Sequence, residues 1–515
     1  MDKAIAVEMR DVTKRFGSVV ANENVCLDVR RGEILSVLGE NGSGKTTLMN
    51  MLSGIYFPDE GQIFVEGKPV TIRSPRDAFE LGIGMIHQHF KLVDVFTAAE
   101  NIVLGLPGPV QLNMNEVRRK ILDLANKYGF ELDVNQKVYD MSVSQKQTVE
   151  ILKVLYRGAK ILILDEPTAV LTPQETERLF RILRNMREDG KAIIIITHKL
   201  AEVLSLSDRV SVLRKGRSVG TVDTAGASVQ SLTELMVGKQ VTLDIERPEP
   251  VNPQRRLAVK DLTCVNLEGI TTLDHASFTA RSGEILGIAG VAGSGQKELL
   301  EAIAGLQPVQ TGAVSFFPKD GDVVDTTHMS AEEIDKLGIH LAFVPEDRLG
   351  MGLVGSMDIT ENMMLRTYRE GRSFFADKRN PRKLAERIVK QLEVVTSGIG
   401  APVRRMSGGN VQKVLVGREI ASAPSVLMVA YPVRGLDINS SYTIYRLLNE
   451  QKVKGSAVIC VGEDLDVLLS LCDRIMVLCG GKVTGIVDAR TATKESVGEL
   501  MTRSERARGE EEKAG

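Results

Sequence analysis

Gly39-Glu40-Asn41-Gly42-Ser43-Gly44-Lys45-Thr46-Thr47 is the stretch that decides the fold of this chain. It follows the strand-like run 33–38 and matches G-x-x-x-x-G-K-S/T, a loop between a buried strand and a helix that binds phosphate groups. Glycines let the backbone wrap around phosphates with its N–H groups pointing inward, and the helix that follows adds the positive end of its dipole. We therefore expect Lys45 to hold the β- and γ-phosphates of a nucleotide and Thr46 to ligate Mg2+.

Length and composition exclude several classes of protein. The chain has 515 residues, of which 43% are hydrophobic and 26% are charged, as is usual for a soluble globular protein with more than one core. Its 65 basic and 67 acidic residues lack the basic excess of a dedicated nucleic-acid binder. No apolar run approaches the roughly 20 residues that span a bilayer, and no signal peptide is evident, so we expect a cytosolic chain. The cysteines show neither zinc-site spacing nor a disulfide pattern, and we expect them to be small buried residues.

An internal repeat indicates that the chain holds two copies of one fold. Gly32-Glu33-Ile34-Leu35 returns as Gly283-Glu284-Ile285-Leu286, and Asp208-Arg209 returns later as Asp473-Arg474. The repeat predicts a first domain over 1–242, a second over 257–502, a linker over 243–256 that is rich in proline and charge, and a charged flexible tail over 503–515.

Within each copy, the pattern of hydrophobic residues predicts an α/β fold. Short β-branched runs such as 160–164 and 192–196 alternate with longer amphipathic stretches such as 176–188. This pattern is typical of a sheet whose central strands are buried on both faces. Buried helix segments are the alternative, but runs of about five residues favour strands.

Three further elements of the first copy fit the chemistry of the phosphate loop. The run 161–164 leads into Asp165-Glu166, where Asp165 is suited to hold a metal and Glu166 to polarise an attacking water. His198 follows another apolar run, where a contact to a γ-phosphate would be useful, although a lone histidine there is more often structural. Gln88 is a candidate for contact with the metal or with water, a role that this glutamine alone would not support.

Together and in this order, these elements resemble the nucleotide-binding domain of an ABC-transporter ATPase, and the resemblance covers residues 5 to 502 in two copies. It implies two P-loop NTPase (ABC ATPase) domains in tandem, each with a mixed-sheet core and a helical subdomain, which bind ATP and Mg2+. Phe16 matches the aromatic residue that stacks on adenine, and a plain core phenylalanine is an equal alternative. The resemblance implies the catalytic residues Glu166, His198 and Gln88, and the metal ligands Thr46, Gln88 and Asp165.

The second copy keeps the shape of the loop and loses its charged groups. Gln296 stands where Lys45 stands in the first copy. Ala430-Tyr431 replace the two carboxylates, and Glu463 replaces the histidine. Because each lost charge-assisted contact is worth about 1.5 to 3 kcal/mol, we expect negligible hydrolysis in this copy, although ATP binding stays open.

The signature segments show the opposite asymmetry. Met406-Ser407-Gly408-Gly409-Asn410 is close to the family's Leu-Ser-Gly-Gly-Gln, whereas Met141-Ser142-Val143-Ser144-Gln145 has lost both glycines. The aspartate of the following D-loop is present as Asp437 in the second copy and is replaced by Thr172 in the first.

In the family the two domains associate head to tail, so the resemblance implies one complete and one degenerate composite site. The nucleotide-binding residues of the complete site are Phe16, Gly39, Glu40, Asn41, Gly42, Ser43, Gly44, Lys45, Thr46, Thr47, Ser407, Gly408, Gly409, Asn410 and Asp437. The degenerate site contains Gly290, Gly293, Gly295, Gln296, Glu346, Ala430, Tyr431, Glu463, Ser142 and Ser144. Independent losses would rarely segregate in this way, so we expect one hydrolytic site.

The resemblance extends to bacterial importers of simple sugars and nucleosides. Three features are similar to those of these importers: the short linker, the degenerate second copy and the segment Arg434-Gly435-Leu436-Asp437. The segments 85–93 and 166–173 look most like those of the nucleoside branch. The implied function is a peripheral ATPase on the cytoplasmic face of the inner membrane that drives nucleoside uptake through two permease subunits, with an extracytoplasmic substrate-binding protein. Alternatives are a simple sugar or a flavin as cargo, a soluble tandem ATPase acting on ribosomes or DNA, and a nucleotide-gated structural subunit without turnover.

Overall fold

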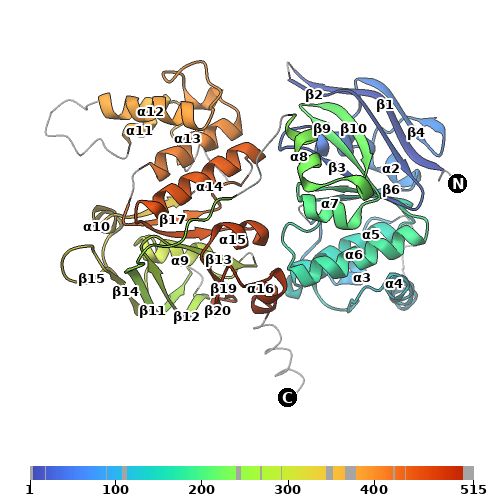
Figure 1. Cartoon of the computed structure of the whole chain (residues 1–515). Helices are drawn as coiled ribbons and strands as arrows, with labels where there is room; N and C mark the ends of the chain where they lie inside the picture. The colour runs from blue at the N-terminus through green and yellow to red at the C-terminus, as the bar shows by residue number, and fades with distance from the viewer. Residues whose placement is uncertain are drawn as a thin grey trace. The chain divides into compact units, whose positions relative to one another are not determined.

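The protein, as a computed structural model, consists of two compact units, Met1–Thr242 and Leu243–Gly515, called unit 1 and unit 2 below (Figure 1). The structure describes residues 4–17, 19–87, 90–106, 113–238, 245–266, 269–291, 293–343, 352–365, 378–421, 424–434 and 436–502.

Unit 1 is built on two sheets. A six-stranded sheet has the order β10-β9-β3-β8-β7-β6, in which β10 runs antiparallel to β9 and the other pairs are parallel. A four-stranded antiparallel sheet has the order β2-β1-β4-β5. The strands are β1 (Ile5–Phe16), β2 (Val19–Arg30), β3 (Glu33–Leu38), β4 (Glu60–Val65), β5 (Lys68–Val70), β6 (Ile83–Ile86), β7 (Ile161–Asp165), β8 (Ala192–Ile196), β9 (Arg209–Arg214) and β10 (Arg217–Asp223). The helices are α1 (Lys45–Leu52), α2 (Pro75–Glu80), α3 (Ala98–Val103), α4 (Met114–Tyr128), α5 (Val143–Tyr156), α6 (Pro173–Glu188), α7 (Leu200–Leu206) and α8 (Val229–Val237).

Unit 2 repeats this topology strand for strand. Its sheets have the orders β20-β19-β13-β18-β17-β16 and β12-β11-β14-β15. The strands are β11 (Arg255–Val265), β12 (Thr271–Arg281), β13 (Ile285–Gly290), β14 (Thr311–Phe316), β15 (Val324–Asp325), β16 (Ile339–Phe343), β17 (Val426–Ala430), β18 (Ala457–Val461), β19 (Arg474–Cys479) and β20 (Lys482–Asp488). The helices are α9 (Gln296–Ile303), α10 (Ala331–Lys336), α11 (Ile359–Met364), α12 (Arg379–Gln391), α13 (Gly408–Ile420), α14 (Ile438–Val453), α15 (Leu465–Leu471) and α16 (Lys494–Met501).

The central strands are the apolar runs of the sequence, and the predicted α/β fold is confirmed. β3, β7 and β8 are buried along their whole length. Burial on both faces selects β-branched residues, which explains why these runs do not alternate in polarity. In each unit the helical part, which contains α3 and α4 or α11 and α12, lies away from the four-stranded sheet (Figure 1). The residues that follow the carboxyl ends of β3 and β7 therefore meet at one edge of the sheet.

Part of the predicted linker packs on unit 2. Asn449 donates a hydrogen bond to the Glu246 carbonyl at 2.6 Å, and Lys452 donates to the Pro248 carbonyl at 2.5 Å. Lys452 is 1% exposed and also pairs with Asp473 at 2.8 Å, so the segment 245–250 covers a buried ion pair. The first strand of unit 2 begins only a few residues later, at Arg255.

Among the residues that the structure describes, no helix has the length and hydropathy to cross a bilayer. Four cysteines are buried, as expected, but Cys26 is exposed, because its side chain points outward from β2.

Candidate active site

The loop between β3 and α1 approaches its neighbours so closely that two of its positions require glycine. A Cβ atom on Gly44 would lie 2.5 Å from the Ala21 carbonyl oxygen, and Gly44 has a φ of 95°, which disfavours other residues. A Cβ atom on Gly39 would lie 2.5 Å from the Ser43 hydroxyl oxygen. Asn41 and Gly42 are exposed at the tip of the loop. The loop backbone is thus open to a ligand that approaches closely.

Polar groups inside this loop are held in place and are only partly satisfied by the protein. Lys45 is 7% exposed, and its Nζ donates to the carbonyls of Gly39 at 2.7 Å and Glu40 at 3.0 Å. Burial lowers the pKa of Lys45, and a bound anion would favour its charged form. The Ser43 hydroxyl is buried without a hydrogen-bond partner. An orphaned hydroxyl beside a constrained lysine fits a phosphate group.

Two carboxylates stand opposite the loop at the end of β7. Thr46 donates from Oγ1 to Asp165 Oδ2 at 3.4 Å, so α1 and β7 bring a hydroxyl and a carboxylate together. Burial and the neighbouring Glu166 raise the pKa of Asp165 to about 6. Oxygen ligands of this kind suit Mg2+, which also neutralises such a crowded carboxylate pair. The residues present therefore fit a magnesium ion.

Glu166 is held by its backbone and by one histidine. Its N–H donates to the Ile196 carbonyl at 2.9 Å and its φ is 48°, which turns the chain out of β7. Glu166 Oε1 lies 3.0 Å from His198 Nδ1, and this hydrogen bond lowers the pKa of the carboxyl group. The carboxylate is consequently ionised at neutral pH and is oriented by β8.

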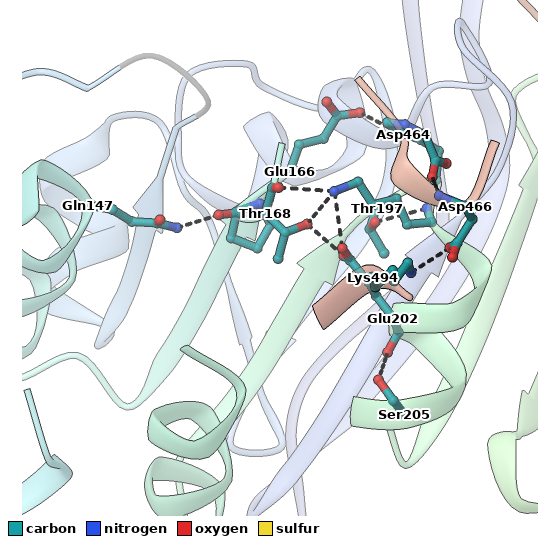
Figure 2. A network of polar contacts seen from close by, with 12 residues as sticks. Gln147, Glu166, Thr168, Thr197, Glu202, Ser205, Asp464, Asp466 and Lys494 are labelled. Atoms are coloured by element: carbon teal, nitrogen blue, oxygen red, sulfur yellow. Dashed lines mark hydrogen bonds and ion pairs between the residues drawn. The ribbon is translucent and has the colours of Figure 1, made fainter. Parts of the chain in front are cut away.

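The segment after Glu166 is fixed by residues that sequence reasoning missed. Gln147 donates to the Pro167 carbonyl at 2.8 Å, and the Thr168 hydroxyl donates to Glu202 at 2.6 Å (Figure 2). Lys199 donates to the Thr168 carbonyl at 3.0 Å. These contacts join α5, the end of β7 and the start of α7, and no local sequence motif predicts them. They position the turn that carries Glu166.

Unit 2 keeps the loop backbone and replaces its charge. Gly295 has a φ of 97°, and a Cβ atom there would lie 2.5 Å from the Thr272 carbonyl oxygen, as at Gly44. Gly293 likewise has a positive φ, and Gly290 leaves no room for a Cβ atom beside the amide of Gln296. Gln296 is 4% exposed and donates from Nε2 to the Val291 carbonyl at 3.0 Å. Its neutral amide thus reproduces one of the two loop contacts that Lys45 makes in unit 1.

Unit 2 also keeps the backbone of the carboxylate turn. Tyr431 has a φ of 50° and its N–H donates to the Val461 carbonyl at 3.0 Å, as Glu166 does to Ile196. Ala430 is buried at the end of β17, where unit 1 has Asp165. Glu463 forms an ion pair with Arg434 at 3.4 Å. Unit 2 therefore keeps the backbone of the turn but has no carboxylate at residues 430 and 431.

Comparison with known proteins identifies this arrangement. The family model for ABC transporters matches residues 22–169 and 273–432, one stretch in each unit. The chain belongs to the ABC transporter family. It is an ATP-binding protein of this family, an ATPase that is coupled to transport.

Individual relatives match over nearly the whole length. The nucleoside import ATP-binding protein NupA of Lactococcus lactis is 42% identical over 97% of this chain and 99% of its own length. The glucose import ATP-binding protein TsgD13 of Haloferax volcanii is 40% identical over 96% and 95%, and the guanosine import ATP-binding protein NupO of Bacillus subtilis is 40% identical over 97% of each. The archaeal ribosome recycling factor aABCE1, solved with the stalk protein aP1, has a TM-score of 0.60 and 16% identity over 96% of this chain and 92% of its own. At that identity it shows the fold alone.

The ABC signature segments of the two units start their helices differently. Ser142 caps α5 through a capping box with Gln145, in which each side chain accepts a hydrogen bond from the other's backbone N–H. Ser407 precedes α13 without capping it, and its hydroxyl accepts a bond from the Asn410 side chain at 2.8 Å. The first turn of α13 therefore keeps N–H groups that could bind an anion, whereas one such group in α5 is already taken. Ser144 is half-buried in the first turn of α5 and adds bulk there.

The structure describes two of the remaining predicted site residues, Asp437 and Phe16. Asp437 caps α14 by accepting a bond from Ser440 N at 2.9 Å. Burial acts to raise the pKa of Asp437, but its bonds from Ser440 outweigh this and lower it. Phe16 is 43% exposed, so the core alternative for this residue is wrong. Gln88 and Glu346 lie outside the described residues.

Proposed function

We propose that this chain hydrolyses MgATP to drive nucleoside uptake through a membrane permease, with one hydrolytic and one degenerate site. The observation that carries the proposal is the asymmetry between the two units. Unit 1 combines Lys45, Asp165, Glu166 and His198, and unit 2 has a neutral residue, an alanine, a tyrosine and a glutamate at the matching positions.

Each residue of unit 1 has a defined task in this reaction. Lys45 and the loop N–H groups bind the phosphates, and Thr46 and Asp165 hold Mg2+, which neutralises phosphate charge when bound. Glu166 accepts a proton from the attacking water, because it is ionised and points away from the sheet toward His198. His198 orients that carboxylate and contacts the γ-phosphate. Gln88 is the remaining candidate for contact with the metal and water.

We propose that the signature of unit 2 completes the hydrolytic site when ATP binds. Gly408 and Gly409 leave the start of α13 free of bulky side chains, and a Cβ atom on Gly409 would meet no atom within 4 Å, so a phosphate can approach there. Asp437 and Asn410 belong to the same proposed site. Nucleotide that contacts both units favours the closed state, and hydrolysis releases it.

The cargo assignment rests on relatives. NupA and NupO are named for nucleoside and guanosine import, which supports a nucleoside for this chain. A simple sugar is the second candidate, because TsgD13 and a ribose import ATP-binding protein of Streptomyces avermitilis, 39% identical, are nearly as similar. The proposed partners are two permease subunits and an extracytoplasmic substrate-binding protein, with this chain peripheral on the cytoplasmic face of the inner membrane.

Uptake measurements in the source cell test this proposal. Deleting the gene should abolish uptake of labelled purine or pyrimidine nucleosides and leave ribose and galactose uptake intact. Wild type should restore uptake, and Glu166→Gln should not. Loss of sugar uptake instead would keep the mechanism and reject the nucleoside, and loss of neither would reject both cargoes.

A further inference from the structure

Two aromatic rings meet beside the phosphate loop of unit 1. Phe16 ends β1 and Tyr56 follows α1, and their ring centroids are 5.1 Å apart at an interplanar angle of 72°. This is the edge-to-face geometry that stabilises aromatic pairs. Both rings are partly exposed, at 43% and 36%, so the pair presents ring surface to solvent. The Phe16 ring is thus supported on one side by Tyr56.

A charged contact fixes the two ring-bearing segments to each other. Lys14 Nζ lies over the Phe16 ring, 5.6 Å from its centroid, and pairs with Asp59 at 2.9 Å. Asp59 also accepts a bond from Arg15 N at 2.6 Å, and its own N–H donates to the Thr13 carbonyl at 2.9 Å. The loop that carries Tyr56 is therefore bonded to the end of β1 that carries Phe16. The ammonium group lies over the ring, and 43% of Phe16 stays exposed to a ligand.

The internal repeat shows that these residues change as a set. Equivalent backbone bonds, from Asp59 N to the Thr13 carbonyl and from Gln310 N to the Thr263 carbonyl, align the two units in this region. In that alignment Phe16, Tyr56, Lys14 and Asp59 correspond to Asn266, Gln307, Cys264 and Gln310. Gln307 instead donates to the Val265 carbonyl at 3.2 Å. The unit without catalytic carboxylates has also lost both rings and the ion pair that joins them.

We propose that Tyr56 is a positioning residue that holds the Phe16 ring in the orientation on which the purine base of ATP stacks. The proposal rests on the proposed ATPase function and on the base-stacking role that the family resemblance implies for Phe16. Tyr56 packs against that ring, and its effect on the nucleotide is transmitted through Phe16. The hydroxyl of Tyr56 has no part in this role, so a phenylalanine should serve equally.

Binding of two ligands by the full-length chain separates this role from a structural one. MgATP carries the base, and magnesium tripolyphosphate carries the phosphates alone. Tyr56→Ala should weaken MgATP binding about threefold to tenfold, the range of an edge-to-face pair, and leave tripolyphosphate binding unchanged. Tyr56→Phe should retain wild-type affinity for both. Tyr139→Ala is the matched control, because Tyr139 is an exposed tyrosine with Lys137 Nζ 5.7 Å from its ring centroid in the helical part of unit 1.

Turnover gives a second readout. In the assembled complex Tyr56→Ala should raise the KM for ATP by a similar factor and change kcat less than twofold. Equal weakening of both ligands would show that Tyr56 supports only the loop, and would overturn the proposal. If Phe16→Ala weakened MgATP binding and Tyr56→Ala did not, the positioning role would be wrong and the stacking role would stand. No effect from Phe16→Ala would overturn both.

Discussion

Replacing Glu166 with glutamine removes one charge and keeps the size of the side chain. The turn that carries the residue depends on backbone contacts, from Glu166 N to the Ile196 carbonyl and from Lys199 to the Thr168 carbonyl, so it should persist in the variant. A glutamine amide can still meet His198 at the observed 3.0 Å but cannot accept a proton from water. The variant therefore isolates the role of the carboxylate as a base.

The size of the effect follows from the state of that carboxylate. The hydrogen bond from His198 lowers the pKa of Glu166, so the base is ionised throughout the neutral range and its whole contribution is lost in the variant. A positioned general base contributes about 100-fold to 10,000-fold, or about 3 to 5 kcal/mol of transition-state stabilisation. We expect kcat for phosphate release by the assembled transporter to fall by that factor, and MgATP binding to stay within about threefold because Lys45 and Ser43 are untouched.

Tyr431→Phe is the matched control in unit 2. Tyr431 has nearly the same positive φ and the same type of N–H contact as Glu166, so any effect of disturbing the turn itself should appear in both variants. Tyr431→Phe and Gln296→Ala should each leave the rate within about twofold. A comparable loss of activity in Tyr431→Phe would refute the single hydrolytic site, and more than a tenth of wild-type activity in Glu166→Gln would refute the role of this base.

Three further predictions concern stability, the signature and the buried ion pair. Burial and Glu166 raise the pKa of Asp165 from 3.8 to about 6, so the folded protein holds this proton more tightly than the unfolded chain and stability is lost as pH rises through that interval. Without metal or nucleotide, Asp165→Asn should therefore be more stable than wild type at about pH 7.5, by up to about 3 kcal/mol. Thermal unfolding measures this difference, and no gain in stability would contradict the burial argument. Ser142→Ala should cost about 1 kcal/mol of stability by removing a cap and leave ATPase activity intact, whereas Ser407→Ala, which removes no cap, should lower activity with little effect on denaturant midpoint; the reverse pattern would reject the assignment of the signatures. Lys452→Met should lower the free energy of unfolding in urea by about 3 to 5 kcal/mol, because Asp473 stays buried. The equivalent Arg187→Met should lower it by about 1 kcal/mol or less, because the pair of Arg187 with Asp208 is partly exposed. Equal costs would show that the linker segment 245–250 does not bury the pair of Lys452 and Asp473.

The fold and most of the phosphate site could be predicted from the sequence because local rules specify them. A loop with this glycine spacing binds phosphate when it follows a buried strand and precedes a helix, and apolar runs of about five residues form the central strands. The turn at Glu166 shows where such rules stop. Gln147, Lys199 and Glu202 reach it from other elements, and no spacing in the chain brings them together before the sheet forms.

The sequence pattern also could not predict which individual side chains lie at the surface. Phe16 could be read as a core residue or as a stacking surface until its partners Tyr56 and Lys14 were known. Cys26 was expected inside and is exposed, because alternate residues of β2 face outward and composition alone does not say which. The Ser-x-x-Gln spacing of Ser142 and Gln145 is that of a capping box, which we did not identify from the sequence, and the box makes this serine less available to a phosphate than Ser407.

Comparison of the two units separates what the fold requires from what the chemistry requires. Unit 2 retains the positive φ at Tyr431, its backbone bond to Val461 and the glycines of its loop, so the fold holds without the charged groups. Those groups carry a cost in unit 1, since burial raises the pKa of Asp165 and lowers the pKa of Lys45. Ala430 and Gln296 remove both costs, and under the proposed single hydrolytic site unit 2 gains no turnover that would offset them. Restoring only those two charges to unit 2 should therefore lower its stability without restoring turnover, because Tyr431 still stands where unit 1 has its general base and Asn266 stands where unit 1 has the ring of Phe16.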